Sequence, residues 1–197
     1  MNKQSNQVFK LSILALMTAL CYIGFQFFRI DIPIGTSSTA IHFGNTFCVL
    51  AALILGGLPG GLAGAIGMGF ADLTNPLYVS SFPQTFILKL CIGMITGLVA
   101  HRIKHLNHIE NTKNLTQWTV LASAAGMFFN VIFDPLFSYF YKNWILGVPS
   151  PAAKIFAAWS AGTTFINAIT SVIIASCLYI ALRKSLKHTT LGKKMFK

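Results

Sequence analysis

Long stretches without a charged side chain dominate this sequence and limit the folds that it can adopt. Uncharged runs cover Leu11–Phe28, Phe43–Ala71, Leu115–Phe133 and Ile155–Leu182, and a fifth run, Phe82–Ala100, carries a single charge at Lys89. Apolar runs of about 18 or more residues are long enough to cross a bilayer as helices. The composition agrees with this, because 54% of the residues are hydrophobic and only 10% are charged. We therefore expect an all-α, polytopic membrane protein.

The run Phe43–Ala71 is long for one membrane span and short for two. Its centre reads Gly56-Gly57-Leu58-Pro59-Gly60-Gly61. Glycine permits unusual backbone dihedrals and proline lacks a donor, so this segment predicts a turn between two short helices. The sequence then contains six spans.

The distribution of basic residues supports an even number of spans. With the N-terminus inside, eleven of the 15 Lys and Arg residues fall in cytoplasmic segments, as the positive-inside rule requires. Arg29, Lys142 and Lys154 lie outside and Lys89 lies in the membrane. Five spans would put the basic C-terminal tail on the opposite side from the N-terminus. We expect both termini to be cytoplasmic.

The expected helices form one integral membrane domain, residues 1–197. They cover about 9–28, 43–56, 60–73, 83–101, 115–140 and 153–183, followed by a basic tail, 184–197. The segments 29–42, 74–82 and 141–152 then face outward. They are polar, contain glycine or proline, and could form a lid.

Lys89 is the most informative single residue. A charge at membrane depth is costly unless it is paired or hydrated, so such residues usually face a bundle interior or a water-filled cavity. Asp72, at the outward end of the third helix, is its expected ion-pair partner, with direct ligand contact as the second role. Asp134 is the other candidate counter-ion. A polar pocket near the outward face is the hypothesis that follows.

Other polar side chains could serve either helix packing or ligand binding. Asn130 lies one turn before Asp134 on the same helical face. Asn167 and Trp159 lie among apolar neighbours on the sixth helix, and a buried Asn must find hydrogen-bond partners. The candidate substrate-binding residues are Asn45, Asp72, Asn75, Lys89, Asn130, Asp134, Trp159 and Asn167.

Several motifs favour structural roles. Small residues four apart in Gly60–Gly69 let helix backbones approach closely, and internal packing is the expected use.

His101, His105 and His108 have spacings that could bind a metal on a helix, but Arg102 and Lys104 lie among them, and we expect no metal site. There is no phosphate-binding loop, nucleophile–base pair or HExxH motif. The sequence therefore predicts no enzyme activity and no cofactor.

Five segments together resemble the substrate-binding (S) components of energy-coupling factor (ECF) vitamin transporters, in the group often labelled riboflavin-type. The resemblance is clear over about 40–100, and it rests on Ile41–Asn45, Ala51–Gly57, Gly60–Gly67, Ala71–Leu73 and Pro83–Lys89. Outside this region the agreement lies in length, six helices, a basic tail, and an Ala-xxx-Ala pair at Ala15 and Ala19. Asn45 departs from the family pattern, where many members have Asp.

The resemblance implies a function. An S component captures a water-soluble vitamin in an outward pocket formed by helices four to six and the outward segments. It then topples in the membrane beside a transmembrane coupling subunit and two ATP-binding subunits. In this family the Ala-xxx-Ala pair contacts the coupling subunit, which implies that role for Ala15 and Ala19. The implied location is the bacterial plasma membrane, with lipid around the helices and no nucleic-acid partner.

The sequence leaves the vitamin open. Riboflavin or a related compound follows from the resemblance, while pantothenate, hydroxymethylpyrimidine or pyridoxine are alternatives. A stand-alone secondary transporter or channel would normally show internal repeats, and none is evident. A non-transporting scaffold would not need Lys89, Asp72 and Asp134 in one half of the membrane.

Overall fold

The computed structural model describes residues 3–35, 37–189, 192 and 195, with side chains from residue 7. Lys193, Lys194 and Lys197 of the expected basic tail lie outside the described residues. The chain runs, in order, through α1 (Lys3–Gln26), β1 (Arg29–Ile34), β2 (Ser37–His42), α2 (Gly44–Leu55), α3 (Gly57–Leu73), α4 (Phe82–Gly97), α5 (Thr112–Phe140) and α6 (Ser150–Leu186).

The expected turn in the middle of the run Phe43–Ala71 is present. Helices α2 and α3 are separated by Gly56 alone, which has a φ of 97°. Few residues other than glycine adopt such a φ without strain. A single residue in this conformation is enough to end one helix and start the next in another direction.

The α4–α5 and α5–α6 connections contain wider helical turns. Helix α4 continues into a π-helical turn, Leu98–Ile103, and helix α5 continues into another, Tyr141–Ile145. Helix α5 begins with Asn111, whose side chain accepts hydrogen bonds from the backbone N–H groups of Lys113 and Asn114. This is the usual means of satisfying free donors at a helix N-terminus.

The all-α expectation is wrong for the segment 29–42, which forms an antiparallel β-hairpin instead of a loop. Arg29 pairs with His42 and Ile34 pairs with Ser37. In β1, Ile30, Ile32 and Ile34 alternate with Arg29, Asp31 and Pro33. This alternation of β-branched with other residues is typical of a strand, and it is followed by Gly35, which has a φ of 60°.

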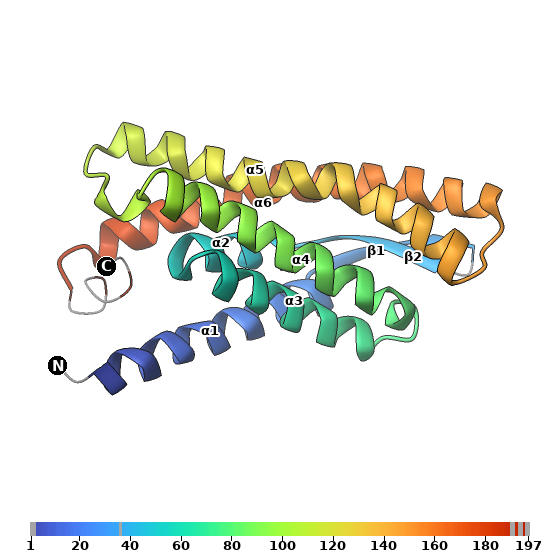
Figure 1. Ribbon diagram of the computed structural model, residues 1–197, viewed down its shortest axis with the longest axis horizontal. Coiled ribbons are helices and arrows are strands. Elements are labelled where there is room, and N and C mark those ends of the chain that lie inside the picture. The colour runs from blue at the N-terminus through green and yellow to red at the C-terminus, as the bar shows by residue number, and fades with distance from the viewer. Residues whose placement is uncertain (1–2, 36, 190–191, 193–194, 196–197) are drawn as a thin grey trace.

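The helices form an elongated bundle in which connections gather at two opposite ends (Figure 1). One end, which we call the termini end, holds both chain ends, the α2–α3 connection and the α4–α5 connection. The other, the hairpin end, holds the tip of the hairpin together with the α3–α4 and α5–α6 connections. Helices α5 and α6 run side by side along the bundle, and α1 lies at its margin.

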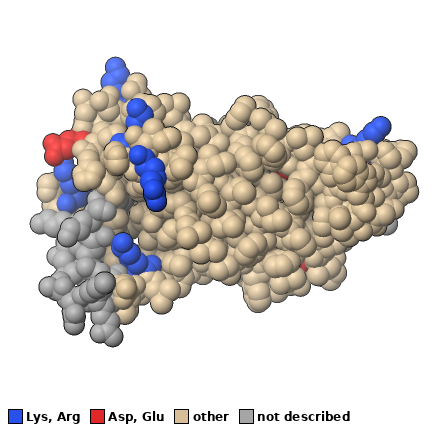
Figure 2. Space-filling view, viewed as in Figure 1, with Lys and Arg blue, Asp and Glu red and all other residues tan. Residues whose placement is uncertain are grey.

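Charge follows the same division. In the view of Figure 2, most Lys and Arg side chains gather at the termini end, and the long band between the two ends shows none. Large apolar side chains are exposed along this band, among them Ile66, Ile87, Phe128 and Ile173. An apolar exterior along the helices is what a lipid-embedded bundle requires.

Four helical segments are long and apolar enough to cross a membrane: Gln7–Gln26, Val79–Ile103, Thr112–Ile145 and Ser150–Leu186. Helix α2 has 12 residues and α3 has 17. At a rise of 1.5 Å per residue their lengths are about 18 and 25 Å, shorter than a hydrocarbon core of about 30 Å. The count of six complete spans therefore stays a prediction.

Glycines hold α3 tightly between its neighbours. A Cβ atom at Gly93 would overlap the backbone of Gly61, and one at Gly97 would overlap the backbone of Gly57. On another face of α3, a Cβ at Gly60 would overlap the backbone of Ala52 on α2. We call the contact of Gly57 and Gly61 with Gly93 and Gly97 the glycine seam. The small residues of α3 thus serve internal packing, which leaves α3 and α4 with their backbones in contact.

Candidate functional site

A cavity opens inside the hairpin end of the bundle. It contains about 530 Å³ of space between atoms, including open solvent at its mouth. Its lining is mostly polar and comes from α1, the hairpin, α2, the α3–α4 region, α5 and α6: Phe25, Ser38, Thr39, Ala40, His42, Asn45, Asp72, Tyr78, Ser81, Thr85, Lys89, Asp134, Phe156, Ser160, Thr163, Thr164 and Asn167.

Asp134 organises the wall formed by α5 and α6. Its Oδ2 atom accepts hydrogen bonds from the hydroxyls of Ser160 at 2.5 Å and Thr164 at 2.8 Å. Its Oδ1 atom accepts from the amide nitrogen of Gln84 on α4 at 3.3 Å, and Gln84 also donates to Ser138 at 2.5 Å. The carboxylate thus ties three helices together, and both of its oxygens are satisfied.

The same wall holds strand β2. The Asn167 Oδ1 atom accepts from the backbone N–H of His42, and its Nδ2 group donates to the backbone carbonyl of Ala40, both at 2.9 Å. The hydroxyls of Thr39 and Thr163 share a hydrogen bond of 2.8 Å. Since Asn167 is 3% exposed, its main role is to join the hairpin to α6.

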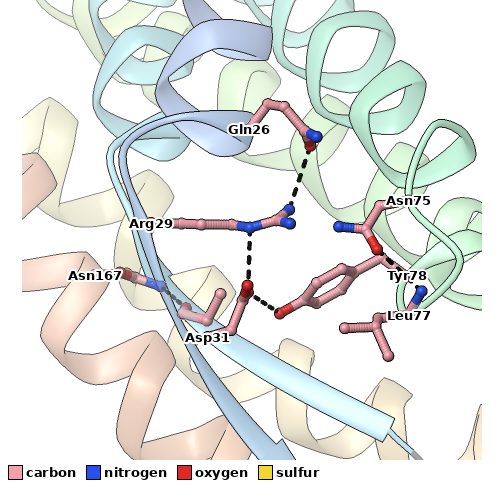
Figure 3. Close-up of polar contacts among 8 residues, drawn as sticks. Gln26, Arg29, Asp31, Asn75, Leu77, Tyr78 and Asn167 are labelled. Atoms are coloured by element: carbon pink, nitrogen blue, oxygen red, sulfur yellow. Dashed lines mark hydrogen bonds and ion pairs between the residues drawn. The ribbon is translucent and has the colours of Figure 1, made fainter.

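Strand β1 is fastened to the α3–α4 connection on the opposite side (Figure 3). Arg29 forms an ion pair of 3.1 Å with Asp31 and donates to Gln26 at 3.3 Å. The Tyr78 hydroxyl donates to Asp31 at 2.6 Å, and the Arg29 guanidinium lies 5.0 Å from the centre of the Tyr78 ring. Burial and the neighbouring Asp31 carboxylate raise the pKa of Tyr78, so its hydroxyl remains the donor.

The floor of the cavity, which we define as His42, Asn45, Asp72 and Lys89, is bonded very differently. Asp72 is 0% exposed and Asn45 is 1% exposed. Neither Asp72 oxygen nor the Asn45 Oδ1 atom has a hydrogen-bond partner among the described residues. The Thr85 hydroxyl lies near the Asp72 carboxylate but does not meet hydrogen-bond geometry, and the charges of Lys89 and Arg29 act on the carboxylate through space. Buried acceptors are usually satisfied, so these three oxygens distinguish the floor from the rest of the cavity.

The expected ion pair of Lys89 is not formed. Within the described part of the chain, no carboxylate oxygen lies within 4.0 Å of the Lys89 nitrogen, and the ion pair at this end of the bundle joins Arg29 and Asp31 instead. Lys89 lines the cavity and is 6% exposed. It acts on Asp72 through space rather than by direct contact.

His42 lies beside Lys89 with a defined tautomer. The backbone N–H of Gly44 donates to the Nδ1 atom at 3.1 Å, so Nδ1 is an acceptor and the neutral ring carries its proton on Nε2. Burial lowers the pKa of His42 well below its usual value, and the charges of Lys89 and Arg29 lower it further. The ring therefore stays neutral at pH 7.

Aromatic rings complete the lining. Phe25 and Tyr78 contact each other edge-on, with ring centres 5.7 Å apart. Phe156 contributes a third ring, and Lys142 lies 4.0 Å from its centre while donating to Ser37 at 3.1 Å. Lys142 is 4% exposed, so this lysine, expected in an outward loop, is buried beside the cavity.

The sequence-based candidates divide into two groups. The cavity brings together Asn45, Asp72, Lys89, Asp134 and Asn167. Three candidates do not line it. Asn75 accepts a hydrogen bond from the Leu77 backbone within its own turn, Asn130 is buried elsewhere, and Trp159 is 52% exposed on the outside of α6. The geometry gives no support to a ligand role for these three.

Sequence reasoning missed most of the hydroxyls that line the cavity. Ser160, Thr163, Thr164 and Asn167 recur at helical spacing on one face of α6, and this polar stripe could have identified the face. No comparable pattern predicts Phe25, Tyr78 or Thr39, because their partners are distant in sequence.

Comparison with known sequences identifies one family. A family model described as "ECF-type riboflavin transporter, S component" matches residues 5–184. A UPF0397 protein from Exiguobacterium sp. is 25% identical over 154 residues, which cover 78% of this chain and 79% of that protein. An uncharacterized protein from Pyrococcus woesei is 35% identical over 68 residues, 34% of this chain and 45% of that protein.

Among solved structures, the fold resembles the S component for biotin from an ECF-type ABC transporter. The TM-score is 0.54 at 20% sequence identity, and the match covers 90% of this chain and 94% of the other. At this level of identity the likeness concerns the fold.

Proposed function

The chain belongs to the family of ECF-type riboflavin transporter S components, and on this premise we propose that it binds a water-soluble vitamin in the cavity at its hairpin end and delivers it across the membrane. Transport would require a transmembrane coupling subunit and two ATP-binding subunits. Family and fold are those of transporter subunits rather than enzymes.

The observation that carries this proposal is a polar cavity inside an apolar bundle. Lys89, Asp72, Asn45 and Asp134 all line it, although polar groups are costly in a lipid-embedded helix unless they serve packing or a ligand. Asp134 serves packing through its three hydrogen bonds. The side chains of the floor do not, which favours a ligand role for them.

The distribution of charge supports an orientation. Basic side chains gather at the termini end (Figure 2), and the positive-inside rule then favours a cytoplasmic location for both termini. The cavity at the opposite end would open to the outside of a bacterial plasma membrane. Single cysteines at Asn107 and Ser185 should then react with a membrane-impermeant reagent only after permeabilisation, and reaction in intact cells would contradict the orientation.

Helix α1 offers a docking surface for the coupling subunit. Ala15 and Ala19 are both exposed, one turn apart on α1, so a partner helix could approach the backbone closely there. Ala15→Trp or Ala19→Trp should abolish uptake in cells while vitamin binding to the isolated protein stays nearly unchanged. Ala181→Trp, at an exposed alanine on α6, is the matched control. A parallel loss of binding would contradict the docking role.

The proposed vitamin is riboflavin or a related ring compound, since three aromatic rings line the cavity. Pantothenate, hydroxymethylpyrimidine and pyridoxine remain alternatives. The deciding experiment is purification from the native host, followed by mass spectrometry of the extracted ligand and identification of co-purifying subunits. A vitamin together with ATP-binding subunits supports the proposal. Uptake by the isolated chain in vesicles, without such subunits, would favour a stand-alone secondary transporter.

A further inference from the structure

The floor of the cavity contains more hydrogen-bond acceptors than donors to satisfy them. Both Asp72 oxygens and the Asn45 Oδ1 atom are buried and unpartnered among the described residues. Asp72 lies near the end of α3 and Asn45 near the start of α2, so the three oxygens come from two separate helices. Both residues line the cavity.

Asp134, the other carboxylate that lines the cavity, has hydrogen-bond donors, so the lack of donors is confined to the floor. Asp134 accepts hydrogen bonds from Gln84, Ser160 and Thr164, so it has little capacity left for a ligand. A ligand that brings hydrogen-bond donors would therefore find its free acceptors on the floor and not on the α5–α6 wall.

Lys89 and His42 supply donors at the same place. The Lys89 ammonium lines the cavity and makes no ion pair among the described residues, and His42 carries its proton on Nε2 because Nδ1 accepts from Gly44. A carboxylate near an ammonium leaves little net charge on the floor. A neutral group with adjacent donors and acceptors fits such a surface, whereas an anion would meet Asp72.

We propose that the floor selects a neutral ligand group rich in O–H or N–H donors, with Asp72 and Asn45 accepting from it and Lys89 donating to it. This assignment rests on the proposed function and makes Asp72 the residue that discriminates against carboxylate-bearing vitamins. Polyol chains and ring N–H groups have the required chemistry. A buried site whose acceptors require O–H or N–H groups from the ligand discriminates strongly between ligands. An analogue that lacks these donors leaves the buried acceptors unpaired.

The first test uses the unaltered protein. In detergent at pH 7.5, calorimetric titration should detect binding of at least one neutral compound among riboflavin, pyridoxine and hydroxymethylpyrimidine. Pantothenate and biotin, which carry carboxylates, should bind at least 100-fold more weakly. Tight binding of a carboxylate vitamin would overturn the inference and leave the proposed function intact. Failure of every vitamin to bind would contradict the proposed function itself.

The second test removes the charge of Asp72 and asks whether the affinity for the ligand falls or rises. Asp72→Asn should weaken binding of the neutral ligand at least tenfold, because one acceptor becomes a donor. If the ligand were an anion, the same substitution should strengthen binding. Asn45→Ala should also weaken binding, at least fivefold, and it decides the question if Asp72→Asn does not fold. Glu110→Gln removes an exposed carboxylate from the α4–α5 connection and serves as the charge control. Unchanged or tighter binding in the floor variants would overturn the inference.

Discussion

The two sides of the cavity differ in how their buried polar groups are satisfied. On the α5–α6 side, Asp134 and Asn167 bond to neighbouring helices and to strand β2. On the floor, Asp72 and Asn45 have buried oxygens without partners among the described residues. A buried acceptor without a donor destabilises a fold by about 1–3 kcal/mol. One side is thus built for stability, and the other retains unsatisfied groups that a ligand can use.

The difference also explains why Lys89 and Asp134 are not a pair, although both are charged and line one cavity. Both oxygens of Asp134 accept hydrogen bonds from hydroxyls and an amide, so the carboxylate is satisfied without a cation. Hydrogen bonds to the charged form stabilise a carboxylate much as an opposite charge does. Counting opposite charges in a sequence therefore predicts ion pairs poorly where hydroxyl groups are abundant.

Removal of the Asp134 carboxylate should have the largest effect on stability. Asp134→Ala leaves the hydroxyls of Ser160 and Thr164 without this acceptor and removes one of the hydrogen bonds of Gln84, and we expect unfolding to become easier by about 4 kcal/mol. Asp72→Ala removes no more than a loose contact with the Thr85 hydroxyl and should cost much less. A thiol-reactive dye can follow thermal unfolding, because Cys21 and Cys48 are buried and free. Equal losses for the two variants would remove the distinction between the two sides.

Asn167→Ala should have the next largest effect. It removes both hydrogen bonds to strand β2, which corresponds to about 2 kcal/mol of stability. The loosened hairpin should also weaken ligand binding severalfold, measurable by calorimetric titration. Thr170→Ala, one turn further along α6, removes a hydroxyl that bonds only within its own helix and is the control. An affinity loss of the same size in both variants would contradict the anchoring role.

The protonation of His42 gives a smaller, pH-dependent effect. The folded protein keeps its pKa well below the usual value, whereas the unfolded chain titrates near 6.5. Below that pH the unfolded state binds more protons, so stability falls as the pH falls, by about 1.4 kcal/mol at pH 5.5 for one group. The stability of His42→Gln, measured by thermal unfolding, should lack this part of the pH dependence. If the slope of stability against pH were the same in the variant and the unaltered protein, His42 would have its usual pKa in the folded protein.

Tyr78→Phe should have the smallest effect. It removes the hydrogen bond to Asp31 but keeps the ring that Arg29 covers, so we expect a loss of about 1 kcal/mol. Tyr78→Leu removes the ring as well and should cost more. If the two variants lost the same stability, the Arg29–ring contact would contribute nothing to the fastening of the hairpin.

The helical part of this fold could be predicted from the sequence because apolar runs and a glycine–proline turn mark the six helices. The hairpin was missed although Ile30, Ile32 and Ile34 alternate in β1. A search for long apolar runs treats such a short strand as a polar loop, because Arg29, Asp31 and Pro33 interrupt its isoleucines. Its partner strand, Ser37–His42, has no clear alternation, and pairing across a tight turn decides its conformation.

The site was predictable in part for a similar reason. Lys89 and Asp72 stand out because a charge within an apolar run has few explanations. Their relation to each other was not predictable, because it depends on how α3 packs against α4. Trp159 is exposed and lies outside the cavity lining, since a large aromatic residue on a membrane helix can face lipid as readily as a ligand.

The glycine seam has a consequence for how this protein can change in evolution. Nearly any side chain added at Gly57, Gly61, Gly93 or Gly97 would meet a backbone and not a movable neighbour. These four positions therefore admit almost no neutral substitutions, and the relative placement of α3 and α4 is fixed across descendants. New ligand preferences should then arise by exchange of side chains that line the cavity, such as Asp72 and Lys89, and not by movement of α3 against α4.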